Sequence, residues 1–130
     1  MINLKDLTYD ELAEFVAECG GEKYRTAQIY SWLYKGAESF EDMSNISKSF
    51  AEKLKKVSYI SVPHMENKYI SKDGTVKYLW RLGDGEYVES VVMQYKHGKS
   101  ICISTQAGCN MGCRFCATAV GGKARDLTAG

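Results

Sequence analysis

The stretch CISTQAGCNMGCRFCATA, residues 102–119, holds four of the five cysteines of this 130-residue chain. Cys109, Cys113 and Cys116 follow the spacing C-x3-C-x2-C, and Cys102 stands seven positions before the first of them. Three thiolates on one short loop can converge on one metal centre, and iron–sulfur clusters are held by cysteine thiolates. The spacing therefore predicts a metal site, with an iron–sulfur cluster as the first interpretation.

A closed zinc site is the main alternative, because Cys102 and the three loop cysteines together supply four thiolates. Structural zinc sites usually place two close cysteine pairs far apart in the sequence, whereas here three ligands crowd one loop. Gly108 and Gly112 let the backbone of that loop curl tightly. The spacing favours iron–sulfur over zinc and leaves zinc open.

Composition and sequence pattern limit the cellular compartment and the binding partners that can be expected for this protein. Seventeen basic and sixteen acidic residues give a net charge of +1, so bulk charge does not indicate nucleic acid, although a local basic patch stays possible. No apolar run approaches the roughly 20 residues that span a membrane. The start, MINLKDLTYDELAEF, lacks the apolar core of a signal peptide. We therefore expect a cytoplasmic protein without membrane contact, where disulfides are rare.

The chain before the cysteines reads as helices followed by strands. A capping box, Thr8 with Glu11, starts a helix that ends at Gly20 and Gly21, and further helices are expected at about 24–35 and 47–57. After residue 59 the apolar period changes to two, with turns at DG, GDGE and KHGK. These turns separate the expected strands 65–71, 75–82, 87–95 and 100–105. A helical layer followed by an antiparallel meander predicts the α+β class.

Two residues on the strands are ambiguous from pattern alone. Cys102 alternates with Ile101 and Ile103, so it faces away from them, which suits either a pocket or a packed core. Glu89 lies between Val88 and Ser90 and suits the solvent face of a strand.

The motif C-x3-C-x2-C with an aromatic residue, Phe115, before the last cysteine resembles the signature of radical S-adenosylmethionine (SAM) enzymes. The longer string CISTQAGCNMGCRFCAT closely resembles the RlmN/Cfr family of radical SAM RNA adenine methyltransferases, nearest to the RlmN branch. YRTAQIYSWLYKG (24–36), DGTVKYLWRLGDGEYVESV (73–91) and RDLTAG (125–130) also fit that family, in its order. The match departs at Lys123, usually apolar or aromatic in the family, and at Asp126, commonly Asn.

The resemblance implies a domain plan. Residues 1–60 would form a helical accessory domain for RNA recognition, residues 61–98 an antiparallel meander, and residues 99–130 the first strand and cluster loop of a radical SAM (β/α) barrel. The remaining barrel units would lie beyond Gly130, so we expect these 130 residues alone not to methylate RNA.

The resemblance also implies roles for individual residues. Cys109, Cys113 and Cys116 would ligate a [4Fe–4S] cluster, whose open iron binds SAM, and Phe115 would pack beside the SAM adenine. In the family a cysteine near the C-terminus carries the methyl group and forms a covalent adduct with RNA. Cys102 would resolve that adduct, and Glu89 would help with proton removal near the substrate.

The implied substrate is an adenine of large-subunit ribosomal RNA, methylated at C2, with transfer RNA as a second substrate in some members. An electron donor such as flavodoxin or ferredoxin is an implied partner, and we expect a monomer. Arg25, Lys35 and the lysines at 53, 55 and 56 are candidates for phosphate contact. Three alternatives remain open: a Cfr-like C8 methyltransferase, a non-catalytic RNA-binding module, and a four-cysteine zinc module.

Overall fold

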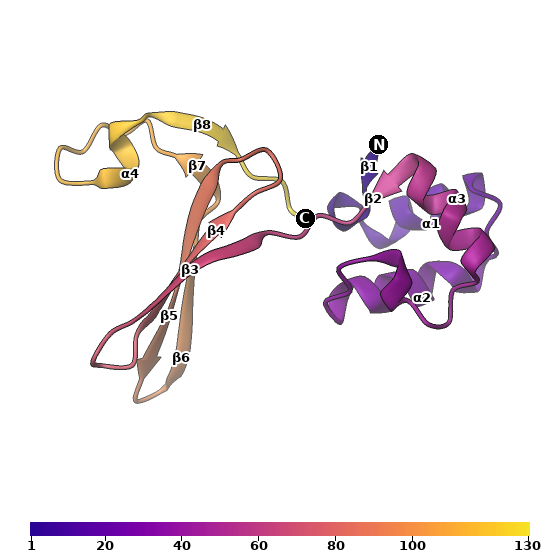
Figure 1. The fold of residues 1–130 in the computed structure, drawn as a ribbon, viewed down its shortest axis with the longest axis horizontal. Helices are drawn as coiled ribbons and strands as arrows, with labels where there is room; N and C mark the ends of the chain where they lie inside the picture. Colours follow the sequence, from indigo (N-terminus) through magenta and orange to yellow (C-terminus); the bar gives the residue numbers. More distant parts are fainter. The chain divides into compact units, whose positions relative to one another are not determined.

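A computed structural model describes residues 1–130, which form two compact units (Figure 1). The first unit comprises Met1–Ser61 with Ala129–Gly130, and the second comprises Val62–Thr128. The combination of helices and antiparallel strands confirms the α+β class. No helix has the length and apolar character needed to cross a membrane.

The first unit is helical and matches the three helices expected from the sequence. It contains α1 (Tyr9–Glu18), α2 (Lys23–Tyr34) and α3 (Lys48–Val57), with short 3-10 turns η1 (Leu4–Asp6) and η2 (Phe40–Asp42). A two-residue parallel pairing of β1 (Ile2–Asn3) with β2 (Ser58–Tyr59) joins the two ends of this unit. Neither short strand was predicted, because two residues carry no alternating pattern.

The apolar stripes of these helices meet in one core. Thirteen buried hydrophobic residues form it, and Leu12, Val16, Ile29 and Leu54 are completely inaccessible. Gly21 turns the chain between α1 and α2, where a Cβ would come within 2.6 Å of Phe50 and Val16. The core of the protein therefore lies in the helical unit, and burial of these side chains supplies most of that unit's stability.

The predicted capping box at the start of α1 is present. The Thr8 hydroxyl accepts the Glu11 N–H (3.4 Å), and the Glu11 carboxylate accepts the Thr8 N–H (2.8 Å). These bonds lower the pKa of Glu11, with the Thr8 backbone N–H as the largest cause.

We expect Thr8→Ala to destabilise the chain by about 1 kcal/mol in urea unfolding. Thr128→Ala, at an exposed position outside any helix, is the matched control. Equal unfolding midpoints for the two variants would count against the cap.

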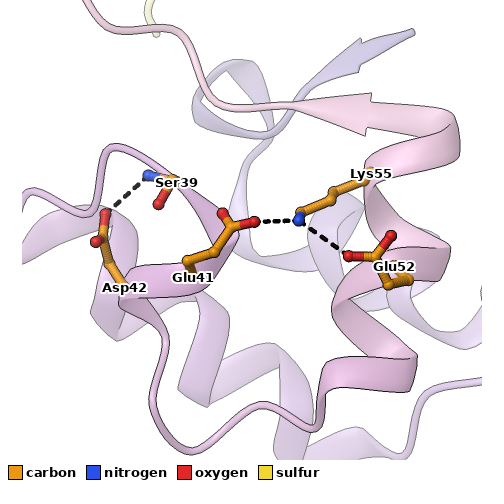
Figure 2. A network of polar contacts seen from close by, with 5 residues as sticks. All are labelled: Ser39, Glu41, Asp42, Glu52 and Lys55. Atoms are coloured by element: carbon orange, nitrogen blue, oxygen red, sulfur yellow. Dashed lines mark hydrogen bonds and ion pairs between the residues drawn. The ribbon is translucent and has the colours of Figure 1, made fainter.

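A polar network ties η2 to α3 (Figure 2). The Lys55 ammonium contacts the Glu41 carboxylate and donates to Glu52 at 3.0 Å, while Asp42 accepts the Ser39 N–H at 2.9 Å. The Lys55 hydrogen bond is the main cause that lowers the pKa of Glu41. Lys55 is thus already neutralised by two carboxylates, which makes it a poor phosphate ligand.

The second unit is built on a four-stranded antiparallel meander with the strand order β3-β4-β5-β6. Its strands are β3 (His64–Ile70), β4 (Val76–Arg81), β5 (Tyr87–Tyr95) and β6 (Gly98–Ile103), close to the predicted ranges. Gly74, Gly85 and Gly98 have positive φ angles at the three turns, as the turn motifs required. The boundary expected between residues 98 and 99 falls at the start of β6, inside this sheet.

A short hairpin follows the meander and carries the cysteine loop. It pairs β7 (Gln106–Gly108) with β8 (Lys123–Asp126), and the one-turn helix α4 (Ala117–Val120) lies between them. Ala107 is the one fully buried hydrophobic residue of the second unit. Whether β6 is also the first strand of a barrel stays a prediction.

Candidate functional site

The three motif cysteines lie on the loop between β7 and β8. Cys113 is exposed, and Cys109 and Cys116 are half-buried. The Cys116 N–H donates to the Cys113 carbonyl at 3.2 Å, and the Met111 N–H approaches the Cys109 Sγ at 3.5 Å. Gly112 has a φ of 68° and supplies the left-handed turn between the first two cysteines.

Cys116 also occupies the N-cap position of α4. The nearby backbone N–H of Thr118, followed by that of Ala119, lowers the pKa of the Cys116 thiol, although the Cys116 side chain makes no capping hydrogen bond to α4. A lowered pKa favours the thiolate, which is the form that binds a metal.

The three cysteine thiols of the loop are chemically suitable ligands for an iron–sulfur cluster. Three free thiols on one accessible loop match the ligand type and number of a cluster with one open iron. The structure does not gather three or more His, Cys, Asp or Glu side chains into one group. Phe115 is 93% exposed, so it is accessible to a ligand beside the loop.

The register of the sheet places the other two candidates on one face. Cys102 of β6 is paired with Val91 of β5, and Glu89 lies two residues before Val91. Side chains two positions apart on a strand share a face, so Glu89 and Cys102 are diagonal neighbours, about 7–8 Å apart at the backbone. Cys102 is exposed, so this thiol is accessible and not part of a packed core.

Polar contacts hold Glu89 on that face. The Lys77 ammonium of β4 lies 3.4 Å from the Glu89 carboxylate and 5.6 Å from the centre of the Tyr69 ring. The Ser104 hydroxyl donates to the Glu89 carbonyl at 2.7 Å, which ties β5 to the segment after β6. A carboxylate, an ammonium and a thiol therefore line one face of the meander.

The opposite face of the meander is apolar. Trp80 and Tyr78 stack there with ring centres 5.5 Å apart, and the Trp80 indole donates to the Ser90 hydroxyl at 2.7 Å. At the edge of this face Ile101 and Ile103 are 67% and 69% exposed. The face that carries Cys102 thus combines polar groups with Val91 and Leu79, whereas the opposite face is mainly apolar.

The two departures from the family pattern contact each other. The Lys123 ammonium lies 2.7 Å from the Asp126 carboxylate, both within β8. An exposed pair of this kind contributes about 0–1 kcal/mol. The resemblance gave the two positions as separate expected departures, while the structure joins them in one charge pair.

Sequence reasoning missed an ion pair between the meander and the cysteine hairpin. The Arg125 guanidinium of β8 donates to the Asp84 carboxylate at 2.5 Å, and the Glu86 N–H donates to the same carboxylate at 3.2 Å. Asp84 occupies a turn that its Asp-Gly dipeptide already explains, so no sequence signal indicates a partner 41 positions away. The pair ties the turn before β5 to the strand after the cysteine loop.

This ion pair predicts a pH-dependent contribution to stability. Arg125 is the largest cause that lowers the pKa of Asp84, so the carboxylate is favoured in the folded state. The contribution is fully present above about pH 4, the ordinary aspartate pKa, and is lost as pH falls through the lowered pKa. We expect Asp84→Asn to lower the urea midpoint at pH 7 and to match the parent chain at pH 2. A difference that persists unchanged to pH 2 would contradict this assignment.

The basic residues of the helical unit differ in what surrounds their charged groups. Lys55 is held by Glu41 and Glu52, and the Lys35 ammonium lies 5.6 Å from the centre of the Trp32 ring. Arg25 and Lys53 line a shallow pocket of about 190 Å³ with Ser47 and Ser49. The Arg25 guanidinium also lies 5.3 Å from the centre of the Tyr24 ring, and Glu22 lines the same pocket, so Arg25 and Lys53 are candidates for phosphate contact beside a carboxylate.

Both units of the chain are similar to known proteins. Residues 2–60 match the ribosomal RNA large subunit methyltransferase N-terminal domain. The whole chain is 52% identical to a probable dual-specificity RNA methyltransferase RlmN of Clostridium novyi, and 49% identical to one of Clostridium tetani. It spans 38% of the length of each of these relatives.

A solved structure shows the same likeness in three dimensions. The crystal structure of a radical SAM methyltransferase from Sphaerobacter thermophilus is 34% identical to this chain, with a TM-score of 0.85. The similarity covers 98% of this chain and 38% of that one.

Proposed function

Because this chain belongs to the RlmN family and corresponds to the N-terminal portion of its members, we propose that the full-length protein methylates an RNA adenine by radical SAM chemistry. By full-length protein we mean the protein at the length of its relatives, of which this chain spans 38%. The observation that carries the proposal is the accessible C-x3-C-x2-C loop, which follows in the chain a sheet face that presents a fourth thiol and a carboxylate.

In this proposal Cys109, Cys113 and Cys116 hold a [4Fe–4S] cluster, and Phe115 contacts the adenine of SAM. When bound, the cluster with SAM would supply one-electron chemistry, and an electron donor such as flavodoxin or ferredoxin would reduce the cluster. The chain's own residues provide the ligands, the accessible loop and the lowered pKa of one ligand thiol.

Cys102 and Glu89 act on the RNA side of the proposed site. Cys102 would resolve the covalent link between enzyme and RNA, and its exposure supports this role, because an exposed thiol can reach an adduct that a buried one cannot. Glu89 lies on the same sheet face, where its carboxylate is available to accept a proton near the substrate. The cysteine that carries the methyl group would lie in the rest of the full-length protein.

The proposed substrate is an adenine of large-subunit ribosomal RNA, methylated at C2, with transfer RNA as a second substrate. Support comes from the match of residues 2–60 to a ribosomal RNA methyltransferase domain and from relatives named dual-specificity RNA methyltransferases. We further propose that the protein works in the cytoplasm as a monomer.

The helical unit is proposed to contact the RNA backbone through Arg25 and Lys53, which line its shallow pocket. Replacing both by Ala should weaken RNA binding by the full-length protein. It should also lower the slope of log affinity against log salt by about 1.4–1.8, since each phosphate contact contributes about 0.7–0.9. Lys55→Ala is the matched control, because that ammonium is already paired with carboxylates. An equal loss for Lys55→Ala would mean that general charge, not this pocket, carries the contact.

Metal analysis after anaerobic purification tests the proposed cofactor. We expect about four iron and four sulfide per full-length protein, with a broad brown absorbance. Stoichiometric zinc without colour would instead indicate a four-cysteine zinc module and would overturn the proposal. Unchanged RNA binding after loss of all three loop cysteines would show only that binding resides elsewhere, so metal content decides the question.

A further inference from the structure

The two ends of the cysteine loop are held together at a close-packed base. The Cys109 N–H donates to the Gly122 carbonyl at 3.1 Å, directly after the pairing of Gly108 with Lys123. A Cβ on Gly108 would lie 1.9 Å from the Gly122 oxygen, and Gly108 has a φ of 76°. Only glycine, which has no side chain, permits this approach, so no other residue fits at position 108 without moving the two ends of the loop.

One side chain crosses the base of the loop. The Asn110 carbonyl oxygen, Oδ1, accepts the Lys123 N–H at 2.9 Å. The backbone N–H of Lys123 thus reaches a partner 13 positions away, next to the first motif cysteine. An Ala at position 110 would leave this N–H without that acceptor, whereas an Asp would offer an acceptor of the same reach.

We propose that Asn110 is a positioning residue that closes the base of the cysteine loop and thereby holds Cys109 for cluster binding. The part of this inference that concerns the cluster rests on the proposed function, while the closure of the loop does not. Asn110 itself would not ligate the metal. Its amide fixes the start of the loop, β8 fixes the end, and the three thiols lie on the segment between them.

The test uses the full-length protein with Asn110→Ala, Asn110→Asp and the control Asn67→Ala. Asn67 is an exposed strand residue whose amide donates to the Tyr69 hydroxyl at 2.9 Å, away from the loop. Hydrogen–deuterium exchange of the Lys123 amide is measured in the metal-free protein. Exchange should be about three- to tenfold faster in Asn110→Ala, and near the parent value in Asn110→Asp and Asn67→Ala. Exchange that is unchanged in Asn110→Ala would overturn the inference.

Iron retention gives the second readout. After reconstitution, loss of iron to a chelator should be about tenfold faster in Asn110→Ala than in the parent or in Asn67→Ala. Faster amide exchange with unchanged iron retention would overturn the positioning role. If the parent protein itself holds no iron, the proposed function fails, and the exchange result alone still decides whether Asn110 closes the loop.

Discussion

Replacing any one of Cys109, Cys113 and Cys116 by Ala is expected to reduce RNA methylation by the full-length protein more than about 100-fold. Changing an outer-shell partner of a metal ligand typically costs about 10–100-fold in affinity or activity, and loss of a ligand itself should exceed that range. Iron content should fall with activity, because a cluster that keeps only two of its three protein ligands is poorly held. The two measurements are iron per protein after anaerobic reconstitution and incorporation of a labelled methyl group into RNA.

The matched control for this series is Cys19→Ala. Cys19 is a half-buried thiol at the end of α1, in the helical unit, and burial is the main cause that raises its pKa. That variant should retain iron and activity, although it will lose some stability through its contact with the helical core. Iron retained at the parent level in all three loop variants would exclude these cysteines as the ligands.

Replacing Cys102 by Ala should stop turnover at a covalent complex between protein and RNA. Removal of a group required in a covalent step lowers turnover by about 100-fold or more, while the earlier steps continue. We therefore expect a protein–RNA species that survives denaturation and accumulates to about one equivalent. Denaturing gel electrophoresis with labelled RNA measures it directly.

The position of Cys102 makes this experiment easy to interpret. Its side chain is exposed in these 130 residues, so truncation should change their free energy of unfolding by no more than about 0.5 kcal/mol. Iron content should match the parent, since Cys102 is not proposed as a ligand. Lost iron together with lost activity would instead favour the four-cysteine metal site that the spacing left open.

Local patterns in the sequence predicted the helices and the meander well. The start of α1 follows from Thr8 and Glu11, whose two reciprocal bonds need no tertiary context. The turn at residues 73–74 likewise follows from an Asp-Gly dipeptide that tolerates a φ of 85° at Gly74. Alternation then fixed which strand residues share a face, which is why Cys102 could be placed opposite Ile101 and Ile103.

Contacts between distant segments could not be predicted in this way. The hairpin of β7 and β8 has strands of three and four residues, QAG and KARD, which are too short for an alternating pattern to be recognised. Its closure depends on Gly108 meeting Gly122 and on Asn110 reaching Lys123, neither of which follows from local propensity. The ion pair of Asp84 with Arg125 likewise exists only because the sheet brings a turn beside β8.

The expected chemistry of the site was inferred from the cysteine motif, whereas the structure describes the surroundings of the individual site residues. The motif indicated which cysteines would bind a metal, but not that the backbone N–H of Thr118, at the start of α4, lowers the pKa of Cys116. It also gave no reason to place Glu89 and Cys102 on one face, which the register of β5 with β6 does. Their roles in the reaction remain proposals that the variants above can decide.

The most direct test of the proposed function is the product made from RNA by the full-length protein. The protein would be reconstituted with iron and sulfide, then incubated with a reductant system, SAM carrying a labelled methyl group, and unmodified large-subunit ribosomal RNA. Nucleosides from the digested RNA are separated and identified by mass spectrometry. We predict labelled 2-methyladenosine. Labelled 8-methyladenosine would contradict the proposed C2 specificity, and the absence of any methylated adenosine from iron-loaded protein would contradict the methyltransferase itself.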